Sequence, residues 1–235
     1  MKNIVLIAIL FTSLTLTGQS YFVNPVEGFS FKKESLVNLK NGEQIEGKIR
    51  NMKVKKGLVK EVVIKIGDEK RTIPAGEIAN MYVAQNSISK IATAIESSKD
   101  LGNYLDDDRF RNKESELLKD GYTYYESHLT EYRKGKELDV LLIVVNPFFK
   151  DKITVFHDPF AGETTSAGVG PLKVGGHAKS YFVKKGDGKV YRIKKKEFKK
   201  SIDGLFDGCN KAKGEGDFSW LKIDKHIFNY TTKCD

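Results

Sequence analysis

A series of short alternating apolar segments between residues 34 and 84 constrains the fold more than any other feature of the chain. Apolar and polar residues alternate on both sides of Asn41-Gly42, a dipeptide typical of tight β-hairpins. Further segments of this kind follow at 59–66, 71–74 and 81–84. Five short strands within about fifty residues predict a small, strongly bent, barrel-like module over residues 30–85.

Strand patterns return after Gly121. The alternating segments are 122–129, 138–145, 152–157, 180–184 and 190–193. Because they are short and separated by turn residues, they predict a second, antiparallel β-rich module over residues 121–193. Within the segment 152–157, Ile153 and Val155 are expected to face one side and Phe156 the other.

Helical spacing marks two other stretches. Apolar residues between Ile88 and Ile95 recur at helical intervals, so residues 86–120 predict a helical and polar linker. Residues 194–235 predict a helical pair, over 195–206 and 218–230, with Gly208 suited to stop the first helix. The predicted fold class is therefore α+β and mainly β.

The first twenty residues have the pattern of a secretory signal peptide. A short positive start is followed by an apolar run over residues 4–16 and by the small residues of Gly18-Gln19-Ser20. This run is shorter than the roughly 20 residues needed to span a bilayer. We therefore expect a signal peptide over 1–20, a mature chain that begins near Gln19 or Tyr21, and export to the periplasm, the outer surface or the medium. We expect no transmembrane segment in the mature chain.

The chain has two cysteines, Cys209 and Cys234. Two cysteines in an exported protein most simply form a disulfide. This bridge would close a loop worth roughly 3–4 kcal/mol in the chain-entropy description. Because no Cys-x-x-Cys pair is present, a structural bridge is favoured over a thiol-redox role.

The segment Leu39-Lys-Asn-Gly-Glu-Gln-Ile-Glu-Gly-Lys-Ile49 resembles the first hairpin of small Sm-like or Src-homology-like barrels. The resemblance covers residues 34–84 and implies a barrel in which the first Gly makes the turn and the second permits a sharp strand bend. Barrels of this kind bind RNA, peptides, cell-wall material or nothing, so the resemblance implies no particular activity.

The second half of the chain contains Leu141-Leu142, Asn146-Pro147, Val155-Phe-His-Asp-Pro159, Gly175-Gly176, Ser180-Tyr-Phe-Val-Lys-Lys-Gly186 and the terminal Cys pair. In these segments it resembles uncharacterised exported proteins of Bacteroidota. The resemblance would extend over most of residues 30–235. It implies an exported protein without implying a substrate or a site.

Positive charge is concentrated towards the end of the chain. The formal net charge is +9, and residues 140–235 hold eighteen Lys or Arg against eleven Asp or Glu. Within Lys184–Lys200, basic residues are interleaved with aromatic ones, which is typical of sites for anionic polymers. The candidate anion-binding residues are Lys184, Lys185, Lys189, Arg192, Lys194, Lys195 and Lys196. The alternative is a solvated polar face.

A second candidate site consists of His157, Asp158 and His177. Two imidazoles and a carboxylate, if brought together, would suit zinc or a hydrolytic base. The spacing matches no known metal signature, and the alternative is that these residues are packed or solvated. The Gly-rich loop 162–176 and the acidic run 106–108 lack, respectively, the P-loop lysine step and the EF-hand spacing, so we interpret them as a surface loop and a linker.

The absence of a catalytic signature favours a non-enzymatic interaction or structural role in the cell envelope. No cofactor is expected. The sequence does not identify the partner, and an envelope protein and an anionic glycan are the two candidates. Two alternatives remain open. One is a metal-assisted hydrolase that uses His157, Asp158 and His177, and the other is a binder of glycan, lipopolysaccharide or nucleic acid through Lys184–Lys200.

Overall fold

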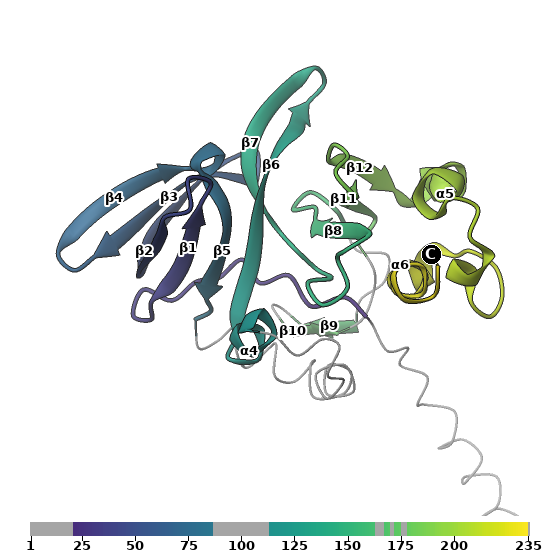
Figure 1. Ribbon diagram of the computed structural model, residues 1–235, viewed down its shortest axis with the longest axis horizontal. Coiled ribbons are helices and arrows are strands. Elements are labelled where there is room, and N and C mark those ends of the chain that lie inside the picture. Colours follow the sequence, from purple (N-terminus) through teal and green to yellow (C-terminus); the bar gives the residue numbers. More distant parts are fainter. Residues whose placement is uncertain (1–20, 87–112, 163–166, 170–171, 175–177, 235) are drawn as a thin grey trace, which may run out of the picture.

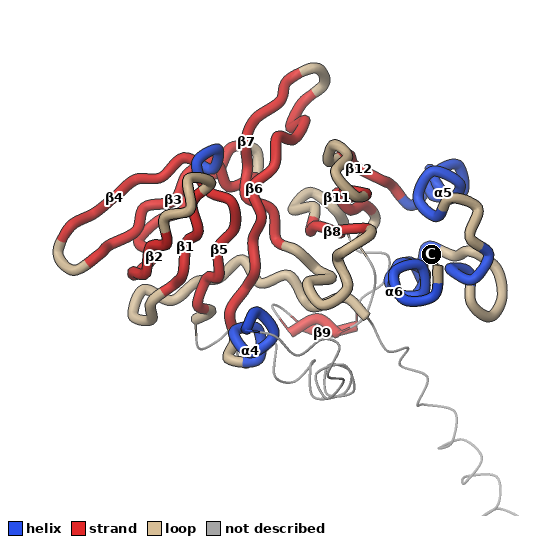
Figure 2. Tube along the Cα trace, in the orientation of Figure 1, coloured by secondary structure: helices blue, strands red, loops and turns tan. Residues whose placement is uncertain are grey.

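The computed structural model describes residues 21–86, 113–162, 167–169, 172–174 and 178–234. Over these residues the chain is mainly β, with a large antiparallel sheet, a smaller second sheet and helices near the C-terminus (Figures 1 and 2). The predicted fold class is therefore confirmed. The expected signal peptide, the apolar pattern at 88–95, the acidic run 106–108 and His177 lie outside the described residues.

The large sheet has seven strands. They are β1 (Ser35–Leu39), β2 (Gln44–Lys55), β3 (Leu58–Ile66), β4 (Glu69–Pro74), β5 (Ile78–Ala84), β6 (Tyr122–Arg133) and β7 (Lys136–Ile143). Their order is β2-β1-β5-β6-β7-β3-β4, and β2 also pairs with β3. Through this additional pairing, the chain of hydrogen-bonded neighbours returns from β3 to β2. A short 3₁₀ turn, η1 (Ala75–Glu77), connects β4 to β5.

The predicted hairpin turn at Asn41-Gly42 joins β1 to β2. Gly42 has a φ of +90°, and the backbone nitrogen of Leu39 donates to the Glu43 carbonyl at 2.8 Å. Further along β2, Gly47 marks a change of partner, because residues 44–47 pair with β1 and residues 48–55 pair with β3. A Cβ atom at Gly47 would lie 2.5 Å from the carbonyl oxygen of Lys65. The close approach of the two backbones therefore requires glycine at this position.

Strands β6 and β7 lie in the large sheet, whereas the sequence pattern placed them in the second module. Strand β6 pairs with β5, with Met81 opposite Tyr125, and β7 meets β3 at Val59 and Leu141. The sequence pattern alone could not show which sheet contains β7, because residues 140–143 are apolar at every position and no single face is marked as buried. These side chains are buried on both faces of β7, as is typical of strands covered on both sides.

The second sheet has the order β12-β11-β8 and comprises β8 (Ile153–His157), β11 (Ser180–Lys185) and β12 (Tyr191–Lys194). A separate two-stranded pair consists of β9 (Ala167–Val169) and β10 (Leu172–Val174). The helices are α4 (Lys113–Lys119), η3 (Lys195–Glu197), α5 (Phe198–Phe206), η4 (Asn210–Lys213), η5 (Trp220–Lys222) and α6 (Ile223–Lys233). The large sheet, the second sheet and helices α5 and α6 follow one another across the molecule (Figure 1).

Three apolar clusters form the core, and strand alternation divides residues among them. One cluster lies within the large sheet and includes Met81. A second lies between the two sheets, where Tyr82 packs in the same cluster as Phe156. A third lies between the second sheet and the helices and contains Ile153 and Val155. The expected division of β8 into an Ile153 and Val155 face and a Phe156 face is therefore confirmed.

The predicted pair of C-terminal helices is confirmed by α5 and α6, and so is the disulfide between Cys209 and Cys234. The αL conformation of Asp207 and the positive φ of Gly208 end α5 where the sequence predicts a stop. Among the described residues, no helix is both long enough and apolar enough to cross a membrane.

Candidate anion-binding site

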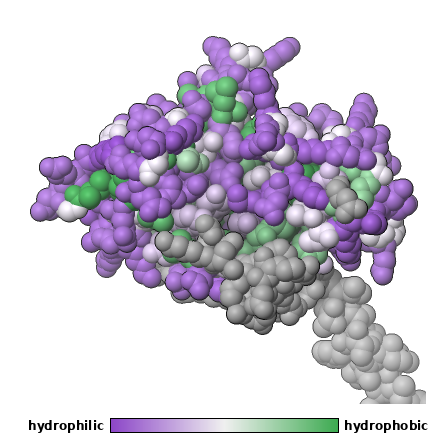
Figure 3. All heavy atoms as spheres, viewed as in Figure 1, coloured by the Kyte–Doolittle hydropathy of each residue, from purple (hydrophilic) through white to green (hydrophobic). Residues whose placement is uncertain are grey.

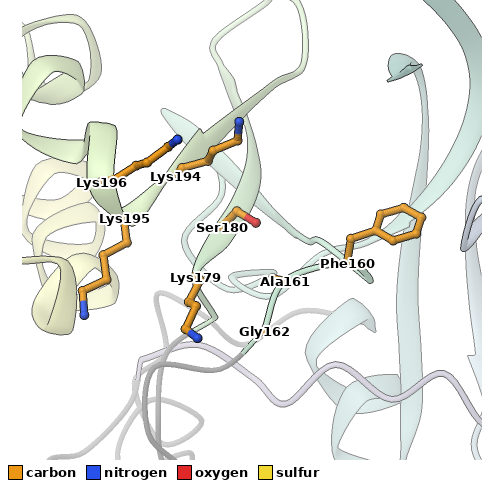
Figure 4. Close-up of a pocket in the computed structure, with 8 residues that line it drawn as sticks. All are labelled: Phe160, Ala161, Gly162, Lys179, Ser180, Lys194, Lys195 and Lys196. Atoms are coloured by element: carbon orange, nitrogen blue, oxygen red, sulfur yellow. The ribbon is translucent and has the colours of Figure 1, made fainter. Parts of the chain in front are cut away.

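A cavity of about 600 Å³ lies where three segments meet. These are the loop after β8, the start of β11, and the end of β12 with the following η3 turn. The residues around the cavity are Phe160, Ala161, Gly162, Lys179, Ser180, Lys194, Lys195 and Lys196 (Figure 4). Four of these eight described residues are lysines, so the described part of the lining carries positive charge.

Backbone hydrogen bonds hold the three segments together. The nitrogen of Lys179 donates to the Gly162 carbonyl at 2.7 Å, and the carbonyl of Lys179 accepts from the nitrogen of Lys195 at 2.9 Å. In the next step of the ladder Ser180 lies opposite Lys194. The backbone positions from which these lysines project are therefore set by sheet pairing.

A buried carboxylate, that of Asp158, connects the segments that line the cavity. Asp158 is 1% exposed, and its Oδ2 atom accepts from the Ser180 hydroxyl at 2.6 Å and from Arg192 Nε at 2.9 Å. Its Oδ1 atom accepts from the backbone nitrogen of Phe160 at 3.1 Å. The Arg192 guanidinium also lies 4.7 Å from the ring centre of Phe182. Asp158 thus connects the loop to both strands that carry the lysines.

Within the described part of the structure, three of the four cavity lysines have no carboxylate partner. Among the described residues, no carboxylate lies within 4.0 Å of the ammonium groups of Lys179, Lys194 or Lys195. Lys196 has an exposed partner, Glu197, at 3.9 Å. In Figure 4, Lys194 and Lys196 extend in one direction and Lys179 and Lys195 in another. Such divergent charges match several anionic groups along an extended ligand better than one compact anion.

The structure separates the seven candidate anion-binding residues into two groups. Lys194, Lys195 and Lys196 line the cavity. Lys185 instead contacts Asp207 and donates to the Gly204 carbonyl at the end of α5. Arg192 pairs with Asp158 as described above. Lys184, opposite Thr154 in the sheet, and the exposed Lys189 are not among the lining residues.

Lys179, Ser180 and Phe160 line the cavity although sequence reasoning did not select them. The sequence feature that could have identified Lys179 and Ser180 is the turn at Gly186-Asp187-Gly188. A hairpin centred on Asp187 places residue 180 opposite residue 194, which is the register observed. No comparable sequence feature predicts that Phe160 lies at the cavity. Phe160 is in the loop after β8, and the position of a loop is not fixed by strand register.

The histidine candidates do not form a common site within the described part of the chain. His157 Nε2 lies 3.5 Å from Glu27 Oε1, whereas Asp158 is bonded to Ser180 and Arg192. The hydrogen bond from His157 lowers the pKa of Glu27 below its ordinary value. Over the described residues, no group of three or more His, Cys, Asp or Glu side chains could hold a metal ion.

His157 and Glu27 border a second, smaller cavity of about 190 Å³ between the large sheet and β8. Its other lining residues are mostly apolar side chains of β2, β3 and β7. Tyr125 also lines this cavity, and burial raises the pKa of its hydroxyl well above the ordinary value. A phenol that stays protonated can serve there as a hydrogen-bond donor but not as a base.

A third polar cluster lies on β6, where Glu126 accepts from Tyr124, His128 and Lys150. The distances are 2.9 Å to the Tyr124 hydroxyl, 3.1 Å to His128 Nε2 and 2.9 Å to Lys150 Nζ. Burial by itself raises the pKa of Glu126, but these three hydrogen bonds outweigh it and lower the pKa to about 2. A carboxylate so fully bonded is suited to stability rather than to proton transfer.

The surface visible in Figure 3 is mostly hydrophilic, with small separate hydrophobic patches. Comparison with family models, with curated proteins and with solved structures finds no match to this chain. The geometry and charge of the lysine cavity are therefore the features that point to a function.

Proposed function

We propose that this protein is an exported, non-enzymatic binding protein that holds an acidic glycan chain at the lysine cavity. The observation that carries the proposal is that Lys179, Lys194, Lys195 and Lys196 all line one cavity of about 600 Å³. Three of these ammonium groups have no carboxylate within 4.0 Å among the described residues. Among the described residues, the site is thus a concentration of positive charge with few carboxylate partners, and such a concentration attracts anions.

The arrangement favours a polymer over a small anion. A compact phosphate or sulfate is typically held by convergent donors, whereas the lysines here extend in two directions (Figure 4). A chain with repeated carboxylates or sulfates can pair with each group in turn. The Ser180 hydroxyl contributes little to ligand binding, because its hydrogen is already donated to Asp158.

An acidic glycan is favoured over a nucleic acid. Single-stranded nucleic acids are typically bound by rows of aromatic side chains that stack on successive bases. Phe160 is the single aromatic residue among the described residues of the lining. An ammonium-rich cavity with one aromatic side chain is better matched to carboxylates or sulfates on sugar rings.

Export to the cell envelope is the second part of the proposal. It is supported by the signal-like pattern of residues 1–20 and by the disulfide between Cys209 and Cys234, since disulfides are typical of oxidising compartments. We further propose that six strands of the large sheet close into a small barrel, namely β2, β1, β5, β6, β7 and β3. The pairing of β2 with β3 supports this proposal, because it joins the last of these six strands to the first.

Binding of a fluorescent, size-defined heparin oligosaccharide tests the proposal, with the oxidised mature protein at 50 and 300 mM NaCl. The test variant combines Lys179→Gln, Lys194→Gln and Lys195→Gln. If each exposed cation contributes roughly 1 kcal/mol, the variant should bind roughly 100-fold more weakly. Affinity of the unaltered protein should also fall at higher salt because the contacts are screened.

The matched control combines Lys32→Gln, Lys33→Gln and Lys40→Gln, which removes the same charge from exposed positions on or near the large sheet. This control should retain most of the affinity. Equal weakening in both triple variants would mean that net charge, and not the cavity, accounts for binding. Tighter binding of single-stranded DNA than of heparin would overturn the assignment of a glycan ligand.

A further inference from the structure

The segment that directly follows the signal-like residues is packed into the folded protein. The ring of Tyr21 lies 4.7 Å from that of Phe228 on α6, centre to centre, and the ring of Phe22 lies 5.4 Å from that of Tyr181 on β11. The backbone nitrogen of Val23 donates to the Val145 carbonyl at 2.7 Å. The chain is therefore anchored to the third apolar cluster from Tyr21 onwards.

The backbone nitrogen of Tyr21 itself contacts a buried carboxylate. It donates to Asp224 Oδ2 at 2.7 Å, although the two residues are 203 positions apart in the sequence. Asp224 is 3% exposed and lies in the first turn of α6, where the helix dipole favours a negative charge. A buried carboxylate is most strongly stabilised by a bonded positive charge.

The sequence before Tyr21 places small residues where signal peptidases require them. Counted back from the bond between Ser20 and Tyr21, Ser20 occupies the first position and Gly18 the third. This is the small-x-small pattern of a cleavage site. Cleavage after Gly18 would instead place Leu16, a large residue, at the third position.

We propose that a signal peptidase cleaves the chain between Ser20 and Tyr21, and that the new α-ammonium group of Tyr21 forms a buried ion pair with Asp224. In this hydrolysis one water molecule is consumed. Ser20 leaves with a carboxylate, and Tyr21 gains the amine, which is protonated at neutral pH. The neutral amide donor to the Asp224 carboxylate thereby becomes a charged ammonium donor, so that direct attraction between opposite charges is added to the hydrogen bond. Processing thus stabilises the mature fold.

The inference rests on the proposed export but is independent of the glycan site. It is tested with two chains produced from fusions whose removal leaves either Tyr21 or Ser20 as the first residue. In the second chain the charge is displaced by one residue from Asp224. Since breaking a buried pair is costly, its melting temperature should be lower by roughly 5 °C or more.

Asp224→Asn is then introduced into both chains. It should lower the melting temperature of the Tyr21 chain by a similar amount and that of the Ser20 chain by much less, because the ion pair exists only in the former. Asp217→Asn is the matched control, since the side chain of Asp217 is 98% exposed, and it should shift neither chain by more than about 1 °C. Equal effects of Asp224→Asn in the two chains would overturn the ion pair.

A measurement on the unaltered protein does not depend on the folding of any variant. The full chain is expressed with its own first twenty residues, and the exported product is analysed by intact mass and N-terminal sequencing. The expected first residue is Tyr21. A chain beginning at Gln19 would overturn this inference alone, whereas an unprocessed chain would overturn the proposed export as well.

Discussion

The carboxylate of Asp158 accepts a hydrogen bond from Arg192 Nε at 2.9 Å, and this pair joins the loop after β8 to β12. The sequence pattern assigned the two residues to different candidate sites, a hydrolytic one and an anion-binding one. The contact between Asp158 and Arg192 explains why neither residue has the role that the sequence pattern assigned to it. It removes Asp158 from the set of available bases and Arg192 from the set of cations available to a ligand.

Asp158→Asn should destabilise the protein by about 3 kcal/mol, because it leaves the Arg192 guanidinium without its buried counter-charge. The free energy of unfolding from urea titrations provides the measurement. Asp187→Asn, in the exposed turn between β11 and β12, is the control and should change stability by less than about 0.5 kcal/mol. Equal stability of the two variants would show that the pair contributes nothing.

Gly47→Ala should destabilise the protein by about 2–3 kcal/mol, because the added Cβ would lie 2.5 Å from the backbone oxygen of Lys65. The matched change is Gly204→Ala on α5, where a Cβ meets no atom within 4 Å. Alanine is favoured there by helix propensity, so that variant should gain about 0.5–1 kcal/mol. Thermal unfolding of both variants tests the contrast, and a loss of stability in both would contradict it.

The local elements of the fold could be predicted from sequence, but the assembly of the sheets could not. Asn41-Gly42 and the alternation of β8 are signals carried by neighbouring residues, and both are borne out. The pairing of β5 with β6 joins residues on either side of a stretch of more than thirty positions. The run at residues 140–145 shows that the segment is buried, but it carries no information on which strand lies beside it.

The stability of the protein should depend on the ionisation of Glu126 in acid. Its pKa is lowered from the ordinary 4.5 to about 2 in the folded state. The contribution is therefore fully present above about pH 4.5 and is lost as the pH falls from about 4.5 towards 2. At most about 3.5 kcal/mol is involved, since one pKa unit corresponds to about 1.4 kcal/mol.

Melting temperatures between pH 6 and pH 3 test this dependence. The Glu126→Gln variant should be less stable than the unaltered protein at pH 6 and should lose less stability on acidification. Glu137→Gln changes an exposed carboxylate on the neighbouring β7 and should leave the profile unaltered. Identical acid slopes for the unaltered protein and Glu126→Gln would argue against the hydrogen-bonded role of this carboxylate.

Removal of the disulfide should cost about 3–4 kcal/mol, the chain-entropy value for a loop of this length. Cys209→Ser combined with Cys234→Ser is the appropriate variant, since it leaves no free thiol. Its urea midpoint should match that of the unaltered protein under reducing conditions. A reduced protein as stable as the oxidised one would contradict the stabilising role of the bridge.

The candidate site could be predicted in part. Lys194, Lys195 and Lys196 belong to a basic run that is visible in the sequence, and they line the cavity. Lys179 directly precedes the neighbouring strand β11, so its position depends on the register of the hairpin. Lys185 and Arg192 belong to the same basic stretch as Lys194, but tertiary contacts pair them with carboxylates. Composition therefore identified the region, whereas the sheet determined which charges remain available.

The most direct test of the lysine cavity is residue-resolved lysine acetylation of the mature protein with and without the heparin oligosaccharide, read by mass spectrometry. Bound glycan should protect Lys179, Lys194, Lys195 and Lys196, while Lys32, Lys33 and Lys40 react as before. Protection of the second group instead of the first, or equal protection of both, would contradict the assignment of the cavity as the binding site.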